Sequence, residues 1–158
     1  MDNSVFYSTG SVFKVVYMGG ASGFTTPKWK GYYTEAIIDT PEIAIEQPPG
    51  SRLVDDDFSY KNFGTVKVGQ EGRSKTFTIM NTGLAELTVS DVLIVALAES
   101  DFIVTDLGET SIDPGASTTF KVTFKPTYAT DRLAKILIKS NDSNCPTFII
   151  RLRGLGVE

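Results

Sequence analysis

Two stretches of alternating sequence decide the fold of this chain: KTFTIM at residues 75–80 and TFKVTFK at residues 119–125. In both stretches large apolar residues occupy every second position, which is the two-residue period of a β-strand with one buried face. We expect these apolar residues to point into one hydrophobic core: Phe77, Ile79, Phe120, Val122 and Phe124. The threonine and lysine residues between them are expected to face water or a neighbouring module.

Further short strands are expected on both sides of this pair. They are predicted at residues 41–47, 63–69, 87–89, 92–97, 101–104, 134–139 and 148–153. Phe63, Val66 and Val68 are expected to face the core, and the uninterrupted apolar run VLIVALA at residues 92–98 predicts a buried strand. Turn signals recur at intervals of roughly 8 to 12 residues and no segment has a helical period. The chain is therefore predicted to be all-β, with an immunoglobulin-like antiparallel β-sandwich over residues 41–158.

The order and spacing of these motifs resemble a known family. The matching segments are FGTVKVG at residues 63–69, KTFTIMNTG at 75–83, LTV at 87–89, DF at 101–102, IDPG at 112–115, FKVTFKP at 120–126, IKSND at 138–142 and LRGLG at 152–156. Over about residues 41–156 the chain resembles the choice-of-anchor D module of the ASH group (ASPM, SPD-2 and Hydin) of immunoglobulin-like domains.

This resemblance implies a non-catalytic spacer or interaction module, and it offers no catalytic residues to carry over. Residues 41–50 also resemble the lead-in strand of bacterial members, which implies a bacterial secreted or cell-surface protein. Cys145 lies where a plain polar loop residue is expected in this family.

Residues 1–40 form a β-rich extension outside the resemblance. Strand-like segments occur at VFY (residues 5–7), VFKVVY (12–17) and AII (36–38). Two or three strands are seldom stable alone in water, so the extension is expected to pack on other structure. It could cover its own sandwich, form the end of a preceding module, or donate a strand to a neighbouring subunit. The residues expected to make such contacts are Val5, Tyr7, Val12, Val15, Tyr17, Trp29, Tyr32 and Tyr33.

Size and charge exclude several classes of function. The 158 residues suit one domain with an extension, and the net charge of -4 disfavours nucleic acid as a partner. No apolar run reaches the roughly 18 residues that span a bilayer, so membrane insertion is not expected. The first residues lack the basic start and apolar centre of a signal peptide, so we expect any export signal to have been removed or to lie outside this sequence.

The inventory of reactive side chains argues against an enzyme. The chain has no histidine, so it lacks the commonest general base and the commonest transition-metal ligand. It has one cysteine, Cys145. No hydrolase motif or phosphate-binding loop is present, and no cofactor is expected. Asp55, Asp56 and Asp57 are weak candidates for a calcium site, because calcium takes loop carboxylates, but they lack EF-hand spacing and also suit a solvated loop.

These observations favour a non-catalytic structural or protein-interaction module of a bacterial secreted or cell-surface protein. One alternative is a self-assembling extracellular filament subunit whose N-terminal strand completes the sheet of a neighbour, which would make the chain a homo-oligomer. Another alternative is a glycan- or calcium-binding accessory domain. Trp29, Tyr32 and Tyr33 could then stack on a sugar ring.

Overall fold

The computed structural model describes the backbone of four N-terminal strands, within residues 5–37, and both backbone and side chains of residues 39–96, 101–105 and 107–158. The chain divides into two compact units, Met1–Asp39 and Thr40–Glu158. Each unit is considered by itself.

The first unit contains one four-stranded sheet. Its strands are β1 (Val5–Thr9), β2 (Val12–Met18), β3 (Lys28–Trp29) and β4 (Tyr32–Ile37), in the spatial order β1-β2-β4-β3. β1 and β2 form an antiparallel hairpin, whereas β2 and β4 run parallel. Among the described strands β2 is therefore enclosed on both sides, and β1 is at an edge.

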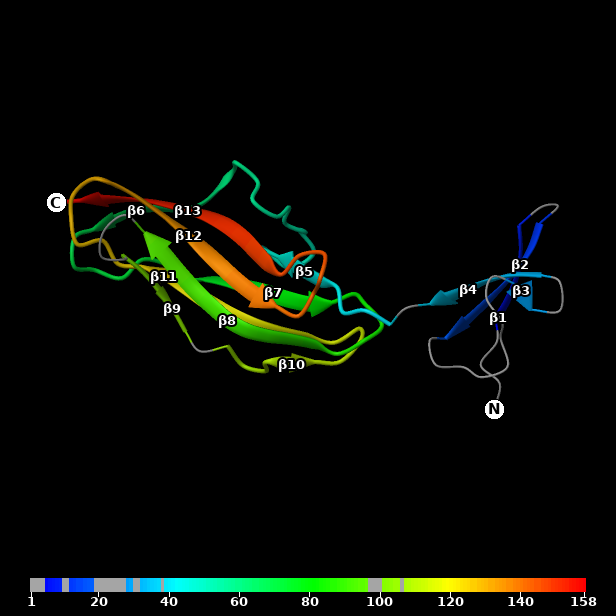
Figure 1. Cartoon of the computed structure of the whole chain (residues 1–158). Helices are drawn as coiled ribbons and strands as arrows, with labels where there is room; N and C mark the ends of the chain where they lie inside the picture. The colour runs from blue at the N-terminus through cyan, green and yellow to red at the C-terminus, as the bar shows by residue number, and fades with distance from the viewer. Residues whose placement is uncertain are drawn as a thin grey trace. The chain divides into compact units, whose positions relative to one another are not determined.

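The second unit is a two-sheet sandwich (Figure 1). One sheet has the order β5-β7-β11-β9, built from β5 (Ile43–Glu46), β7 (Lys75–Asn81), β9 (Phe102–Val104) and β11 (Ser117–Phe124). The other has the order β10-β8-β12-β13-β6, built from β6 (Tyr60–Lys67), β8 (Leu87–Ala96), β10 (Ser111–Ile112), β12 (Asp131–Ser140) and β13 (Thr147–Val157). The structure confirms the predicted all-β, immunoglobulin-like sandwich. One pair of neighbouring strands within it, β6 and β13, is parallel.

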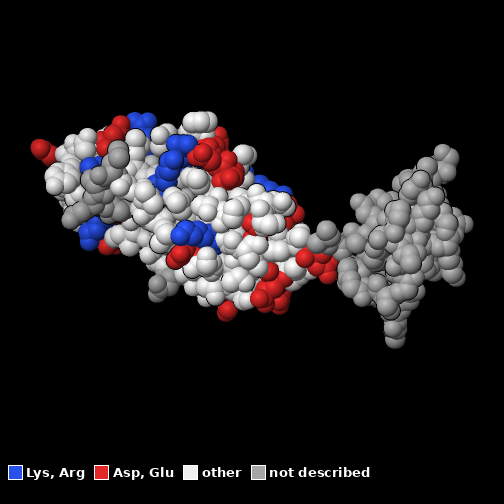
Figure 2. Space-filling model, in the orientation of Figure 1, with Lys and Arg blue, Asp and Glu red and all other residues white. Residues whose placement is uncertain are grey.

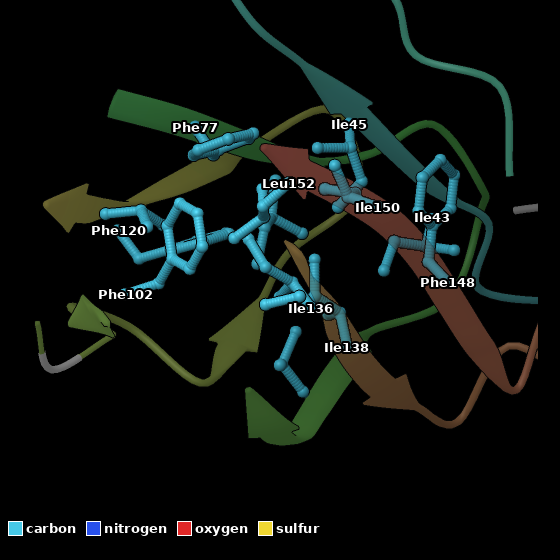
Figure 3. Close-up of a cluster of buried hydrophobic side chains, with 14 of the residues drawn as sticks. Ile43, Ile45, Phe77, Phe102, Phe120, Ile136, Ile138, Phe148, Ile150 and Leu152 are labelled. Carbon is cyan, nitrogen blue, oxygen red and sulfur yellow. The ribbon is translucent and has the colours of Figure 1, made fainter. Parts of the chain in front are cut away.

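The core forms where the alternating faces of the two sheets meet (Figure 3). All five residues predicted from the two decisive stretches are at most 1% exposed, so this prediction is confirmed. The rings of Phe77 and Phe120 stack with centroids 5.2 Å apart, because these residues are directly opposite in the β7–β11 ladder. The facing sheet contributes its own alternating set of buried residues: Ile136, Ile138, Phe148, Ile150 and Leu152.

Two glycines of the LRGLG motif lie where the backbone and core approach closely. A Cβ on Gly156 would lie 2.0 Å from the carbonyl oxygen of Tyr128, and a Cβ on Gly154 would lie 2.5 Å from the Phe124 ring. Contacts this short are impossible without rearrangement, so these positions accept only glycine in the present packing.

Buried polar side chains fix the loops at the ends of the sandwich. Asn81 donates from its amide to the carbonyls of Ala85 (2.7 Å) and Ile112 (2.9 Å). Asp142 accepts from the backbone N–H of Ile43 at 2.9 Å, which ties the loop after β12 to the first strand of the other sheet. Since buried polar groups without partners are costly, these bonds specify how the loops close.

Two predictions of burial are wrong. The run beginning at Val92 was expected to be buried, but Leu93 and Val95 on β8 are 39% and 50% exposed. Only the alternate residues of this strand face the core, because a sandwich covers one face of each sheet. Val68, predicted to face inward, is 41% exposed because β6 ends at Lys67, just before it.

Candidate interaction surface

The candidate site is the solvent side of the five-stranded sheet, which we call the outer face. Along β12 and β13 the residues between the buried ones must point outward, because side chains alternate across a strand. The ladder places Val95, Lys135, Arg151 and Tyr60 on one continuous row across four strands. Leu93, Leu137 and Ile149 form the next row. The outer face is thus positioned by regular strands and not by loops.

Apolar side chains dominate the centre of the outer face. Val95 and Leu133 are each 50% exposed, on the two neighbouring strands β8 and β12. The other large apolar residues exposed on this face are Tyr60, Leu93 and Leu155. Figure 2, seen from the side of β8 and β12, shows uncharged surface between separate groups of Lys, Arg, Asp and Glu side chains. A sheet face in contact with water usually carries polar residues, so this composition points to a covered surface.

A shallow groove of about 320 Å³ crosses this face. Its walls include Tyr60, Val95, Leu133, Lys135 and Arg151. The groove therefore combines apolar walls with two cationic side chains. Such a combination is suited to binding, because apolar walls can cover apolar side chains and cations at defined positions can orient a charged group.

Arg151 joins the groove to the neighbouring loop. Its guanidinium donates to Asp56 at 2.6 Å and lies 4.9 Å from the centre of the Phe58 ring. Phe58 is itself 83% exposed, so it extends the apolar surface beyond the sheet. These contacts hold the Arg151 side chain in one orientation.

The three aspartates proposed as weak calcium ligands each have a different protein partner. Asp55 accepts from the backbone N–H of Ile149 at 2.7 Å, Asp56 accepts from Arg151, and Asp57 accepts from the hydroxyl of Ser59. In the part of the chain that the structure describes, no group of three or more acidic, cysteine or histidine side chains is placed to hold a metal ion. The geometry assigns Asp55 and Asp56 to anchoring the loop before β6 on β13, and Asp57 to a contact within that loop.

The eight interaction residues predicted in the N-terminal extension fall on its four strands. Val5 and Tyr7 are on β1, Val12, Val15 and Tyr17 on β2, Trp29 on β3, and Tyr32 and Tyr33 on β4. The backbone register pairs Trp29 with Tyr32. Their side chains lie outside the described part of the structure, so their contacts stay a prediction.

Cys145 gives the sandwich a measurable dependence on pH. Burial, together with the negative charges of Asp55 and Asp142, raises the pKa of its thiol from 9.0 to about 11. The unfolded chain therefore loses this proton at a lower pH than the folded chain, so this contribution to stability is complete below pH 9.0 and is lost as the pH rises to about 11. We expect wild type to lose stability more steeply than Cys145→Ala across this range in urea unfolding at several pH values. Parallel curves for the two proteins would contradict the assignment, because all other titrating groups are shared.

Sequence reasoning missed the outer face as a site. The available signal was that apolar residues occur on both faces of β8 and of β12. On β12, Leu133 and Leu137 lie on one face, and Ile136 and Ile138 lie on the other. On the solvent side of β12, Leu133 and Leu137 alternate with Lys135 and Lys139, so only half of these outward positions are polar. The run of β8 was instead interpreted as wholly buried.

Within the described residues, no helix is both long and apolar enough to cross a membrane. A family described as HYDIN/CFA65/VesB-like, Ig-like domain matches residues 53–155. Comparison with curated proteins gave no match.

Among the solved structures that match, two with TM-scores above 0.5 share the fold. A protein of unknown function from Porphyromonas gingivalis W83 is 20% identical with a TM-score of 0.52, over 73% of this chain and 66% of that one. The human ASH/PapD-like domain 7 of CEP192 is 14% identical with a TM-score of 0.51, over 88% and 96%. The secreted serine protease VesC from Vibrio cholerae is 17% identical with a TM-score of 0.48, over 60% of this chain and 21% of VesC. The chain thus spans less than two thirds of the Porphyromonas and Vibrio proteins.

The family match covers most of the sandwich and, apart from Gly156, it contains the motifs on which the resemblance was based from FGTVKVG onward. Domains of this group are generally non-catalytic and generally mediate protein–protein interactions. The chain belongs to the HYDIN/CFA65/VesB-like family of immunoglobulin-like domains, of the ASH type.

Proposed function

We propose that this chain is a non-catalytic interaction module of a bacterial secreted or cell-surface protein, and that it binds a protein partner through the outer face. The observation that carries the proposal is the set of exposed apolar side chains on β8 and β12, with Val95 and Leu133 each 50% exposed. Burying such side chains against a partner contributes about 25 cal/mol per Å² of apolar area. The bacterial and extracellular setting rests on the resemblance of residues 41–50 to the lead-in strand of bacterial members.

In the proposed mechanism, the sandwich holds the outer face in a fixed conformation for the partner to bind. The outer face is built on strands whose opposite sides form the core, so its side chains keep their spacing without a partner. Ala134, Ile136 and Ile138 alternate with the outward residues of β12 and are at most 6% exposed. Little conformational entropy is lost when such a preformed surface binds, which favours affinity.

Site-directed photocrosslinking tests this proposal. A photoreactive residue would be placed at position 133 on the outer face or, as a matched control, at position 103, where Ile103 is 45% exposed on the other sheet. Intact cells of the source organism would be irradiated and adducts identified by mass spectrometry. We expect one defined adduct from position 133, none from position 103, and loss of the adduct when Val95→Asp is added. The absence of an adduct at 133, or the same adducts at both positions, would refute a specific outer-face interaction.

A second experiment on the same cells tests whether the chain is at the cell surface or secreted. Treating intact cells with a protease that cannot enter them should degrade the chain if it is at the surface. Recovery in the medium would indicate secretion. A chain that is neither degraded nor released would refute the extracellular setting while leaving the binding result unaffected.

Self-assembly is a second candidate, favoured by the position of β1 at an edge of its sheet among the described strands. An edge strand can pair with a strand of another copy. Light scattering should then show larger species that disappear in Tyr7→Pro, because proline removes a backbone donor from β1. A wild-type chain that stays monomeric at all concentrations would exclude this role.

A further inference from the structure

The row through the groove places two cations side by side. Lys135 and Arg151 are direct partners in the antiparallel β12–β13 ladder, and both line the groove. Like charges in directly opposite positions destabilise a sheet. Because this pairing is unfavourable for the sheet, the presence of Lys135 and Arg151 together at the centre of an apolar face suggests a function.

Two other cations on β12 and β13 have ion pairs within the chain. Arg153 donates to Asp131 at 2.8 Å, and Lys139 lies 3.6 Å from Asp91. Lys135, by contrast, has no ion pair within the described residues. Among the described residues, the walls of the groove include no carboxylate. Lys135 thus adds to the groove a positive charge that has no ion pair in the described structure.

Arg151 is only partly satisfied. Its terminal nitrogen is bonded to Asp56, but its Nε is buried and has no hydrogen-bond acceptor in the described structure. The side chain is 16% exposed. A buried donor without an acceptor is costly, and a guanidinium forms its strongest hydrogen bonds with carboxylates.

We propose that the groove binds a carboxylate carried on an apolar segment, namely an Asp or Glu side chain of the partner protein, between Lys135 and Arg151. The inference rests on the proposed function and names the chemistry of its partner. The carboxylate supplies the missing charge for Lys135, and apolar neighbours of the acid contact Val95, Leu133 and Tyr60. Once the partner covers these walls, the ion pair is screened less than a fully exposed one.

A pair of small probes tests this chemistry without knowledge of the partner. The probes are 4-phenylbutanoate and its uncharged analogue 4-phenylbutanamide, titrated into the ¹⁵N-labelled full chain and followed by NMR. We expect 4-phenylbutanoate to shift the Nε–H resonance of Arg151 saturably, and the amide to bind at least about ten-fold more weakly. Loss of one signal in Arg151→Lys assigns the resonance.

Two lysine variants test whether Lys135 is one of the cations that bind the carboxylate. Lys135→Gln should raise the Kd for 4-phenylbutanoate at least about five-fold, because one of the two cations is lost. Lys121→Gln is the matched control, since Lys121 is an exposed lysine on β11 of the other sheet. It should leave the Kd unchanged, and unchanged backbone spectra would show that both variants are folded.

The outcomes separate this inference from the proposed function. Equal binding of both probes, no binding of either, or equal effects of the two lysine variants would overturn the carboxylate site. None of these results removes the apolar outer face, which the crosslinking from position 133 tests independently. Conversely, selective binding of 4-phenylbutanoate without any crosslinked partner would support the site and refute the interaction role.

Discussion

Phe77→Ala is expected to lower the free energy of unfolding by about 3 to 5 kcal/mol. Phe77 is fully buried and stacks on Phe120 with ring centroids 5.2 Å apart, so the substitution leaves a cavity between two central strands and removes a ring contact. The two strands are pinned by their ladder and cannot collapse into the space. Urea unfolding followed by circular dichroism measures the loss.

Phe58→Ala is the matched control for Phe77→Ala. Phe58 is 83% exposed and contacts the Arg151 guanidinium, so the same truncation removes little buried area. We expect a loss of at most about 1 kcal/mol, the range of an exposed cation–π contact. Similar losses in the two variants would contradict the placement of Phe77 in the core between the two sheets.

Asp101→Ala is the second large effect, with an expected loss of about 3 to 5 kcal/mol. Asp101 is 3% exposed, accepts from the backbone N–H and hydroxyl of Thr127 at 2.9 and 2.6 Å, and is paired with Arg132. Its removal takes one ion-pair partner from Arg132 and the anchor from the segment after β11. Urea unfolding again provides the measurement.

The double variant Asp101→Leu with Arg132→Met should recover part of this loss, because replacing both members of a buried pair by apolar residues removes the uncompensated charge. Asp131→Ala serves as the exposed control. Its pair with Arg153 is about half exposed on both sides, so the expected cost is about 0 to 1 kcal/mol. A cost for Asp101→Ala no larger than that of Asp131→Ala would contradict the role assigned to Asp101.

Much of the sandwich could be predicted because its strands obey a simple rule. Alternation in TFKVTFK specifies which residues of β11 are buried whatever lies opposite them. The same rule failed for β8, where apolar residues occur on both faces of the strand. This pattern does not distinguish a strand that is buried on both faces from a strand that is buried on one face. Only the number of layers settles that question.

The candidate site followed from information that local patterns do not contain. Lys135 and Arg151 are 16 positions apart in the sequence and become neighbours through the β12–β13 register. Tyr60 joins their row only because β6 pairs in parallel with β13. Likewise, the three consecutive aspartates before β6 were weak candidates for a metal site from their sequence alone. In the structure their hydrogen-bond partners are contributed by β13 and by Ser59.

By itself, the sequence determined the alternating faces, the turns between them and the absence of histidine chemistry, because these depend on residue type and on spacing along one strand. Tertiary structure alone decided which apolar residues stay in contact with water and which charges meet. That outcome depends on strand order, register and the two-layer packing, which bring distant segments together over distances that no local pattern encodes.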